Sequence, residues 1–199
     1  MFMIIKSVNI GKIGITPAEV PYFEIGSGSP TGTILAVQHG GEWSPLWVIK
    51  SFLEQQKSFT GTARIIPVVN QFGFIAGVRN EIIEGKDLNR QYPGNPKGDF
   101  SARLADVIFT LCQSVDFVID LHTFERQTPF VAGYTKGGAA QPKIEKLMQL
   151  LAPDIVWVIN EKKGEDRRFQ GSLDGALTEI GIPCVFLEMP NYSSIQSEF

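Results

Sequence analysis

Two histidines, His39 and His122, are the only imidazoles in this chain, so chemistry that needs an imidazole has few places to occur. His39 begins the segment His39-Gly-Gly-Glu42, and His122 lies in the segment Asp120-Leu-His-Thr123. Two histidines and one glutamate, two of them close in sequence and one distant, are typical of a zinc site that leaves a fourth coordination position open to water. We therefore consider His39, Glu42 and His122 as candidate metal ligands.

The spacing of His39 and Glu42 is weak support when taken alone. The chain has 13 glutamates among its 199 residues. By chance, a histidine therefore has a glutamate three residues later in about one case in fifteen, so this spacing alone is only a hypothesis. A single histidine at a strand end is also more often a hydrogen-bonded residue than a ligand. What favours a metal site is a coincidence: both histidines are expected to follow buried strands that end at one edge of the same sheet.

Short apolar runs rich in β-branched residues predict buried strands, and the longer segments between them have apolar residues at helical spacing. The expected strands cover residues 33–37, 63–69, 115–121, 155–159 and 184–187, and the expected helices cover 45–56, 101–111 and 141–151. This alternation predicts an α/β fold with a mostly parallel sheet that helices cover on both faces.

The carboxyl ends of the strands form the edge where open α/β sheets bind ligands, so residues at these ends are the first candidates for a functional site. Gly40 and Gly41 allow a tight turn between the strand 33–37 and a helix that begins at Pro45. His39 and Glu42 lie in this turn, and their side chains can therefore converge.

Two further groups belong to the same edge. Asn89 and Arg90 lie in the glycine-rich connection 70–100, which is longer than most loops, and together they offer an amide and a guanidinium fork suited to a substrate carboxylate. Glu188 follows the last strand, where apolar neighbours could raise its pKa into the range of a general base. The alternatives are a surface arginine paired with an acid and a solvated glutamate at a strand end.

Composition sets the class of protein. The chain has 199 residues, 43% hydrophobic and 20% charged, with a net charge of −3. This predicts one globular domain with a sizeable core and provides no basic surface for nucleic acid.

Cys112 and Cys184 are isolated and are expected to be reduced, buried thiols. The apolar stretch 1–5 is too short for a signal peptide or a membrane span, so we expect a cytoplasmic protein without membrane partners.

Four segments in fixed order resemble the succinylglutamate desuccinylase/aspartoacylase family, a branch of the zinc carboxypeptidase-like hydrolases. They are His39-Gly-Gly-Glu42, Asp87-Leu-Asn-Arg-Gln-Tyr-Pro-Gly94, Asp120-Leu-His-Thr123 and the strand-borne Glu188. The resemblance extends from about residue 30 to 190. It implies the three-layer αβα fold of the zinc carboxypeptidases, with a mixed, mostly parallel sheet, and one Zn²⁺ per chain bound by His39, Glu42 and His122.

The resemblance also implies roles for other residues. Glu188 would be the general base, Asn89 and Arg90 would hold the carboxylate of the substrate, and Arg79 would polarise the scissile carbonyl. Arg167 and Arg168 are the alternatives to Arg79. Asp87 would orient a zinc-binding histidine, with His39 as the expected partner, and Asp120 is expected to support the ligands in the same way, since zinc sites need such acids behind their histidines.

The activity implied by the resemblance is hydrolysis of the amide bond, or of a related ester, in an N-acyl amino acid or similar small carboxylate. Two alternatives stay open: a carboxypeptidase-like enzyme that acts on a peptide or amidated small molecule, and a non-catalytic domain that binds zinc or a ligand. Family members continue into a β-rich domain that covers the site, whereas 11 residues follow Glu188 here. We therefore expect residues 1–199 to form a single catalytic domain. Either the chain is a truncated or divergent member of the family, or the cover comes from elsewhere, such as a neighbouring subunit of a homo-oligomer.

Overall fold

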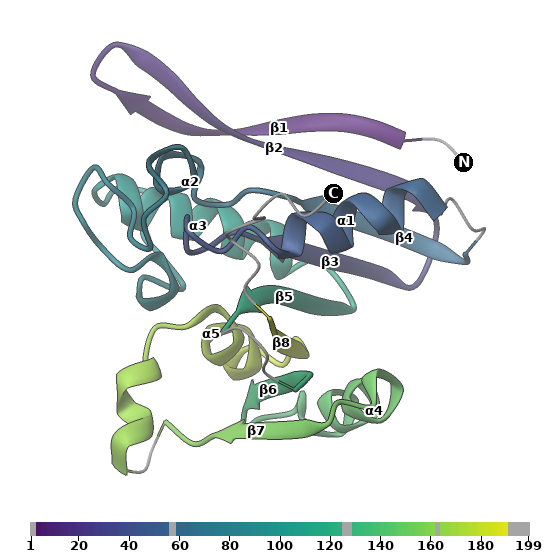
Figure 1. Ribbon diagram of the computed structural model, residues 1–199. Helices are drawn as coiled ribbons and strands as arrows, with labels where there is room; N and C mark the ends of the chain where they lie inside the picture. The colour runs from purple at the N-terminus through teal and green to yellow at the C-terminus, as the bar shows by residue number, and fades with distance from the viewer. Residues whose placement is uncertain (1–2, 56–58, 125–128, 162–163, 191–199) are drawn as a thin grey trace, which may run out of the picture.

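An eight-stranded mixed sheet forms the centre of the protein (Figure 1). The computed structural model describes residues 3–55, 59–124, 129–161 and 164–190. The strands are β1 (Met3–Ile13), β2 (Thr16–Ser27), β3 (Thr31–Ala36), β4 (Gly61–Ile66), β5 (Phe117–Thr123), β6 (Val131–Thr135), β7 (Ile155–Ile159) and β8 (Cys184–Met189). The helices are α1 (Pro45–Gln55), α2 (Gln71–Ala76), α3 (Phe100–Cys112), α4 (Gln141–Leu151) and α5 (Leu173–Glu179), with 3₁₀ helices at η1 (Leu88–Arg90) and η2 (Gly164–Phe169).

The strand order is β1-β2-β4-β3-β5-β8-β6-β7, so the last strand in the chain is inserted between β5 and β6. Strands β4, β3, β5 and β8 run parallel, β2 and β6 are antiparallel to their central neighbours, and β7 is parallel to β6. The mixed, mostly parallel sheet expected from the sequence is therefore confirmed. Because the four central strands are parallel, their carboxyl ends lie at one edge of the sheet.

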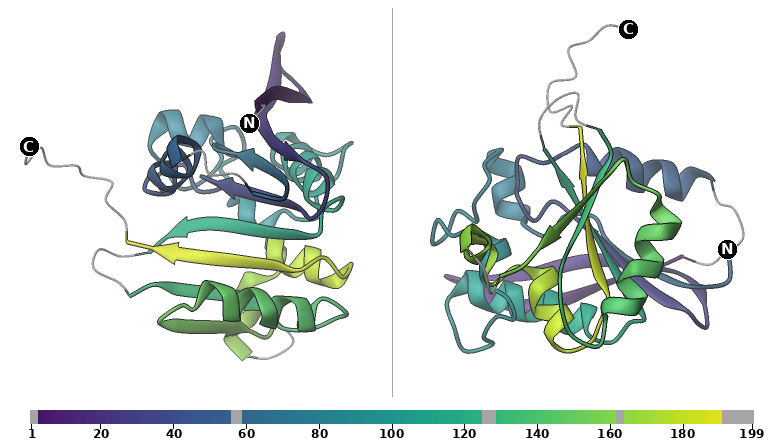
Figure 2. Two further views of the ribbon diagram at one scale, coloured as in Figure 1. Left: turned by 90° about the vertical axis from the view of Figure 1, so that its right-hand side faces the viewer. Right: turned by 90° about the horizontal axis from the view of Figure 1, so that it is seen from below.

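Helices cover both faces of this sheet (Figure 2). Successive residues of the central strands alternate between two core clusters, as side chains do across a pleated sheet. Leu35 and Val118 pack with α3 and α5 on one face, while Ala36 and Val185 pack with α1 and α4 on the other. This three-layer αβα arrangement agrees with the expected fold class.

The N-terminal segment, in which the sequence predicted no strand, contains β1 and β2, which form a long antiparallel hairpin at one edge of the sheet (Figure 1). Strand β6 and helices α2 and α5 were also not predicted. Strand β5 begins two residues later than expected and continues to Thr123, so His122 lies within the strand. Among the residues described, no helix is both long enough and apolar enough to cross a membrane. Cys112 and Cys184 are buried free thiols, as expected.

The turn after β3 is held in an unusual backbone conformation. Val37 has a φ of 57°, a left-handed conformation that is rare for a β-branched residue and costs about 1–3 kcal/mol. Its carbonyl accepts a hydrogen bond from the backbone N–H of Asn70 at 2.9 Å, and the Asn70 amide donates to the carbonyl of Gln38 at 3.2 Å. The start of the connection 70–100 thus fixes the direction in which the chain leaves β3.

Gly40 makes the closest approach in this turn. A Cβ atom at Gly40 would lie 2.0 Å from the backbone carbonyl carbon of Gly73 in α2, a distance that real side chains do not adopt. At Gly41, a Cβ would meet only the carbonyl oxygen of Gly77, at 3.5 Å. Of the two adjacent glycines, Gly40 is therefore the one that the close approach to α2 requires.

We expect Gly40→Ala to lower the free energy of unfolding by about 1–3 kcal/mol or more, because the turn must move away from α2 to admit the methyl group. Gly41→Ala is the matched control and should change the free energy of unfolding by no more than about 0.5 kcal/mol, as for most sites without a steric conflict. Denaturant unfolding of the two variants measures both values. Similar losses in the two proteins would contradict the role given to Gly40.

Candidate metal centre and active site

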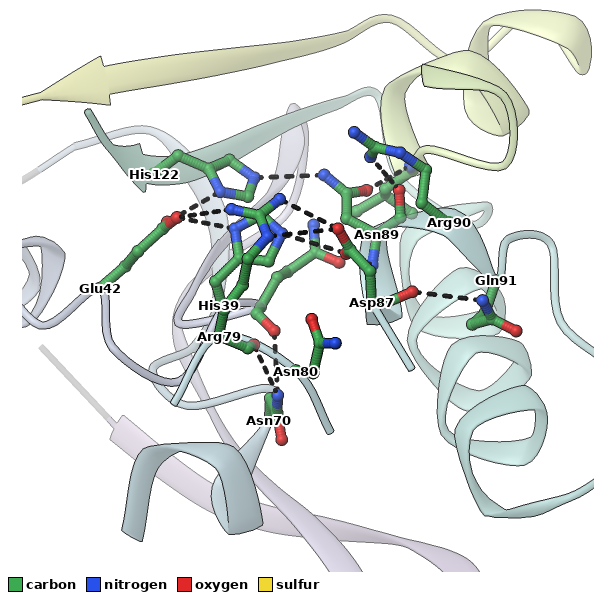
Figure 3. Close-up of polar contacts among 12 residues, drawn as sticks. His39, Glu42, Asn70, Arg79, Asn80, Asp87, Asn89, Arg90, Gln91 and His122 are labelled. Carbon is green, nitrogen blue, oxygen red and sulfur yellow. Dashed lines mark hydrogen bonds and ion pairs between the residues drawn. The ribbon is translucent and has the colours of Figure 1, made fainter. Parts of the chain in front are cut away.

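His39, Glu42 and His122 come together at the carboxyl edge of the sheet (Figure 3). His39 and Glu42 lie in the turn between β3 and α1, and His122 lies near the end of β5, the strand next to β3. All three side chains are buried, and one potential ligand atom from each lies within 4.8 Å of the others. The sequence-based expectation that the two histidine segments meet is therefore confirmed by the geometry.

The Glu42 carboxylate lies between the two imidazole rings. Its Oε1 is 2.7 Å from Nδ1 of His39, and its Oε2 is 3.0 Å from Nδ1 of His122. Oε2 also accepts a hydrogen bond from the backbone N–H of Thr123 at 3.1 Å. The Nδ1 atom of each ring thus faces Glu42, and these three side chains offer two nitrogens and one carboxylate to a common space.

The other nitrogen of each ring faces an acid. Nε2 of His39 is 3.2 Å from Oδ1 of Asp87, and Nε2 of His122 is 3.0 Å from Oδ2 of Asp120. Metal-binding histidines have this arrangement, with one ring nitrogen for the ion and the other bonded to a carboxylate. The donor set and the surrounding acids therefore fit a zinc ion.

The charges of the site are strongly coupled. Burial alone would raise the pKa of Glu42, but His122 and His39 outweigh this and hold the pKa far below its usual range. Burial would likewise raise the pKa of Asp87, which His39 and Arg79 lower. Burial lowers the pKa of His122, but Asp120 and Glu42 dominate and raise it well above 6.5. The carboxylates thus create a negative potential that favours a cation at this position.

Arg79 lies beside the cluster. Its guanidinium donates to Oδ2 of Asp87 from Nη2 at 3.0 Å, and Nη1 is 3.8 Å from Oε1 of Glu42. The two alternatives lie elsewhere: Arg167 lines a neighbouring cavity, and the Arg168 guanidinium is 5.1 Å from the centre of the Phe169 ring. Of the three arginines, Arg79 is the one that lines the cavity around the cluster.

Asn89 and Arg90 lie in the short helix η1, which Asp87 caps by accepting a hydrogen bond from the Asn89 backbone N–H at 3.0 Å. Nδ2 of Asn89 is 3.5 Å from Nε2 of His122. The Arg90 guanidinium donates to the carbonyl of Arg168 at 2.7 Å and lies 5.2 Å from the Phe169 ring, and burial lowers its pKa. Both residues line the cavity, as a role in substrate binding requires.

Glu188 lies opposite His122 in the register of the parallel strands β5 and β8. Residues in register point to the same face of a sheet, so the two side chains face the same cavity. Burial raises the Glu188 pKa and the charge of Glu42 adds to this effect, while His122 acts in the opposite direction. The net result is a raised pKa.

The cavity has a volume of about 170 Å³ and aromatic walls that the sequence-based reasoning missed. Trp157 lies edge-on to Phe169 and Phe186, with ring centres 5.5 and 5.7 Å apart. Phe186 precedes Glu188 by two residues on β8 and so shares its face, a signal that the alternation of the strand contained.

A comparison with models of protein families shows the family of the chain. Residues 29–198 match the model of the succinylglutamate desuccinylase/aspartoacylase catalytic domain. The chain belongs to this family. The match includes every segment on which the resemblance was based.

Relatives of this succinylglutamate desuccinylase/aspartoacylase family chain include the N-alpha-acetyl-L-2,4-diaminobutyric acid deacetylase of Halomonas elongata. It is 30% identical over 121 residues, which cover 57% of this chain and 35% of the relative. The product-bound ectoine utilization protein EutE (DoeB) of Ruegeria pomeroyi has a TM-score of 0.80 at 23% identity, covering 98% of this chain and 62% of that structure. A succinylglutamate desuccinylase from Silicibacter sp. TM1040 has a TM-score of 0.79 at 20% identity, with 98% and 61% covered. The chain spans about a third of the curated relative and about three fifths of these structures.

The raised pKa of His122 predicts how the stability of the metal-free protein depends on pH. Because the folded state holds the His122 proton more tightly than the unfolded state, this stabilisation is complete below about pH 6.5 and is lost as the pH rises through the folded pKa. We expect the free energy of unfolding to fall as the pH rises from about 6.5 through the folded pKa of His122. In His122→Asn, the decrease that comes from the His122 proton should be absent. Denaturant unfolding of both chelator-treated proteins across the range measures it, and parallel curves would contradict the assignment.

Proposed function

We propose that the protein is a zinc-dependent deacylase that hydrolyses the amide bond of an N-acyl amino acid. The observation that carries this proposal is the buried cluster of His39, Glu42 and His122, with Glu188 in the same cavity. Family membership supports the reaction class, and the names of the relatives, a deacetylase of N-acetyl-diaminobutyric acid and a succinylglutamate desuccinylase, support an N-acyl amino acid as substrate.

Zinc would be held by Nδ1 of His39, Nδ1 of His122 and the Glu42 carboxylate, since these atoms face one another. When bound, a zinc ion lowers the pKa of a coordinated water and polarises a carbonyl group. Asp87 and Asp120 would hold the two rings by their Nε2 atoms and keep Nδ1 free for the ion.

Glu188 would move the proton. Both histidines of the chain have a place among the ligands, so neither imidazole is free for acid–base chemistry. Glu188 would accept a proton from the attacking water and later deliver it to the amine that leaves. Its raised pKa suits both halves of this task, since a group that accepts and then returns a proton works best with a pKa near the working pH.

Arginine and amide groups would position the substrate. Arg79 carries a half-exposed guanidinium at the cavity and would stabilise the charge that develops on the scissile carbonyl oxygen. Asn89 and Arg90 line the cavity beside it and would bind the carboxylate of the amino-acid portion. The aromatic walls formed by Trp157 and Phe186 would exclude water from the reacting bond.

Activity should depend on the metal. We expect turnover of a panel of N-acyl amino acids, loss of that turnover when a chelator removes the metal, and recovery on addition of Zn²⁺. The panel should pair acetyl and succinyl groups with acidic, neutral and amine-bearing amino acids. Turnover that survives metal removal would refute the proposal. Cleavage confined to peptides would favour a carboxypeptidase-like enzyme, and a zinc-loaded protein without any turnover would favour a binding domain.

Replacing the proposed base should separate catalysis from metal binding. Glu188→Gln keeps the size of the side chain but cannot accept the proton, so we expect kcat to fall by about 10²–10⁴-fold with an unchanged zinc content. In the wild type, kcat/KM should decline as the pH falls through the raised Glu188 pKa, because the base must be ionised. Glu179→Gln, at the exposed end of α5, is the control and should retain activity. Equal kcat values in the two variants would exclude Glu188 as the base.

A further inference from the structure

A buried chain of hydrogen bonds connects Tyr92 to the candidate ligand His122. The Tyr92 hydroxyl is 2.6 Å from Oε1 of Gln38, and Nε2 of Gln38 donates to Oδ2 of Asp120. The same Oδ2 is 3.0 Å from Nε2 of His122. The exposed fractions of these four residues are 5%, 0%, 1% and 3%, so water takes little part in the chain.

The chemistry of these groups fixes the direction of every hydrogen bond. An ionised carboxylate only accepts, so the Gln38 amide nitrogen and Nε2 of His122 must both donate to Asp120. Oε1 of Gln38 then faces Tyr92 and can only accept, so the phenol donates. Burial raises the Tyr92 pKa, which keeps the phenol protonated. If the Gln38 side-chain amide were rotated by 180°, its oxygen would face the Asp120 carboxylate and the two acceptors would repel each other. The observed orientation prevents this repulsion.

Asn89 is a second polar residue near Nε2 of His122. Its Nδ2 lies 3.5 Å away, at the limit of a hydrogen bond, and its Oδ1 accepts from the backbone N–H of Leu173 at 2.9 Å. The amide therefore presents a donor to the ring and cannot take the place of Asp120 as acceptor. Oδ1 of Asp120 has no hydrogen-bond partner within the described part of the chain, so both donors converge on one oxygen.

We propose that Tyr92 and Gln38 are positioning residues that act through Asp120 to keep a proton on Nε2 of His122, so that Nδ1 is the ring nitrogen directed at the ion. This inference rests on the proposed zinc site and extends it by two residues that do not line the cavity. His39 has a different support, because Asp87 is partly exposed and shared with Arg79. The His39 ring is thus held by a partly exposed acid, and the His122 ring is held by a fully buried hydrogen-bond chain.

Zinc affinity tests the chain of contacts. We expect Asp120→Asn to weaken Zn²⁺ binding by about 10–100-fold, as for other acids behind zinc ligands, and Tyr92→Phe or Gln38→Met by about 3–10-fold. Tyr92→Phe combined with Asp120→Asn should bind no more weakly than Asp120→Asn alone, because Tyr92 acts through that acid. Competition with a chromogenic chelator measures each dissociation constant.

Tyr134→Phe is the matched control, since it removes a phenol hydroxyl from another buried tyrosine, in β6, that bonds Gln141 at 3.3 Å. Its zinc affinity should equal that of the wild type. An unchanged affinity in Tyr92→Phe, additive losses in the double variant, or an equal loss in Tyr134→Phe would each overturn the inference.

A second measurement does not require zinc to bind. The chain has two histidines, so proton–nitrogen NMR spectra of protein labelled with ¹⁵N-histidine contain two ring systems, and His39→Gln assigns them. We expect a slowly exchanging proton on Nε2 of His122 in the metal-free wild type, and exchange at least about tenfold faster in Tyr92→Phe and Gln38→Met but not in Tyr134→Phe. A His122 proton confined to Nδ1, or equal exchange rates in wild type and Tyr92→Phe, would overturn the inference. Weak zinc binding by a wild type with the expected Nε2 proton would count against the proposed function alone.

Discussion

The contact that the site depends on is the buried carboxylate of Glu42 between the Nδ1 atoms of His39 and His122. A buried charge in this position is costly unless its neighbours balance it. The surrounding structure supplies that balance: strands β3 and β5 bring the two rings to adjacent ends, and the strained Val37 directs the turn that carries Glu42. The nearby carboxylates leave an excess of negative charge at the cluster, and this charge favours the binding of a cation there.

Much of the central sheet could be predicted from the sequence because its strands are buried on both faces and appear as continuous apolar runs. The hairpin β1–β2 was missed because its strands are long, partly exposed and interrupted by polar residues, so they lack such a run. Strand β6 has only five residues, with Gly133 in its middle, and carries little signal. Helix α2 is six residues long, shorter than the window in which helical spacing can be recognised.

The candidate ligands were predictable for a geometric reason. Residues at the carboxyl ends of parallel strands lie at one edge of the sheet, independent of the conformation of the connecting loops. The placement of Arg79 beside Asp87 was not, because it depends on the path of the connection 70–100. The sequence did not predict that Gln38 and Tyr92 support the site. A glutamine before a histidine and a tyrosine in a turn have no distinguishing spacing, and only the folded chain shows that Tyr92 bonds Gln38, which in turn bonds the buried Asp120.

Strand β8 is the last strand of the described chain, yet it lies inside the sheet between β5 and β6. During synthesis on the ribosome, the segments that contain His39, Glu42 and His122 therefore emerge well before Glu188. The final insertion must form long-range pairings with two strands at once, which is characteristic of slow steps in folding. If the proposed function is correct, the residues that would hold the ion are thus synthesised before the residue that would move the proton.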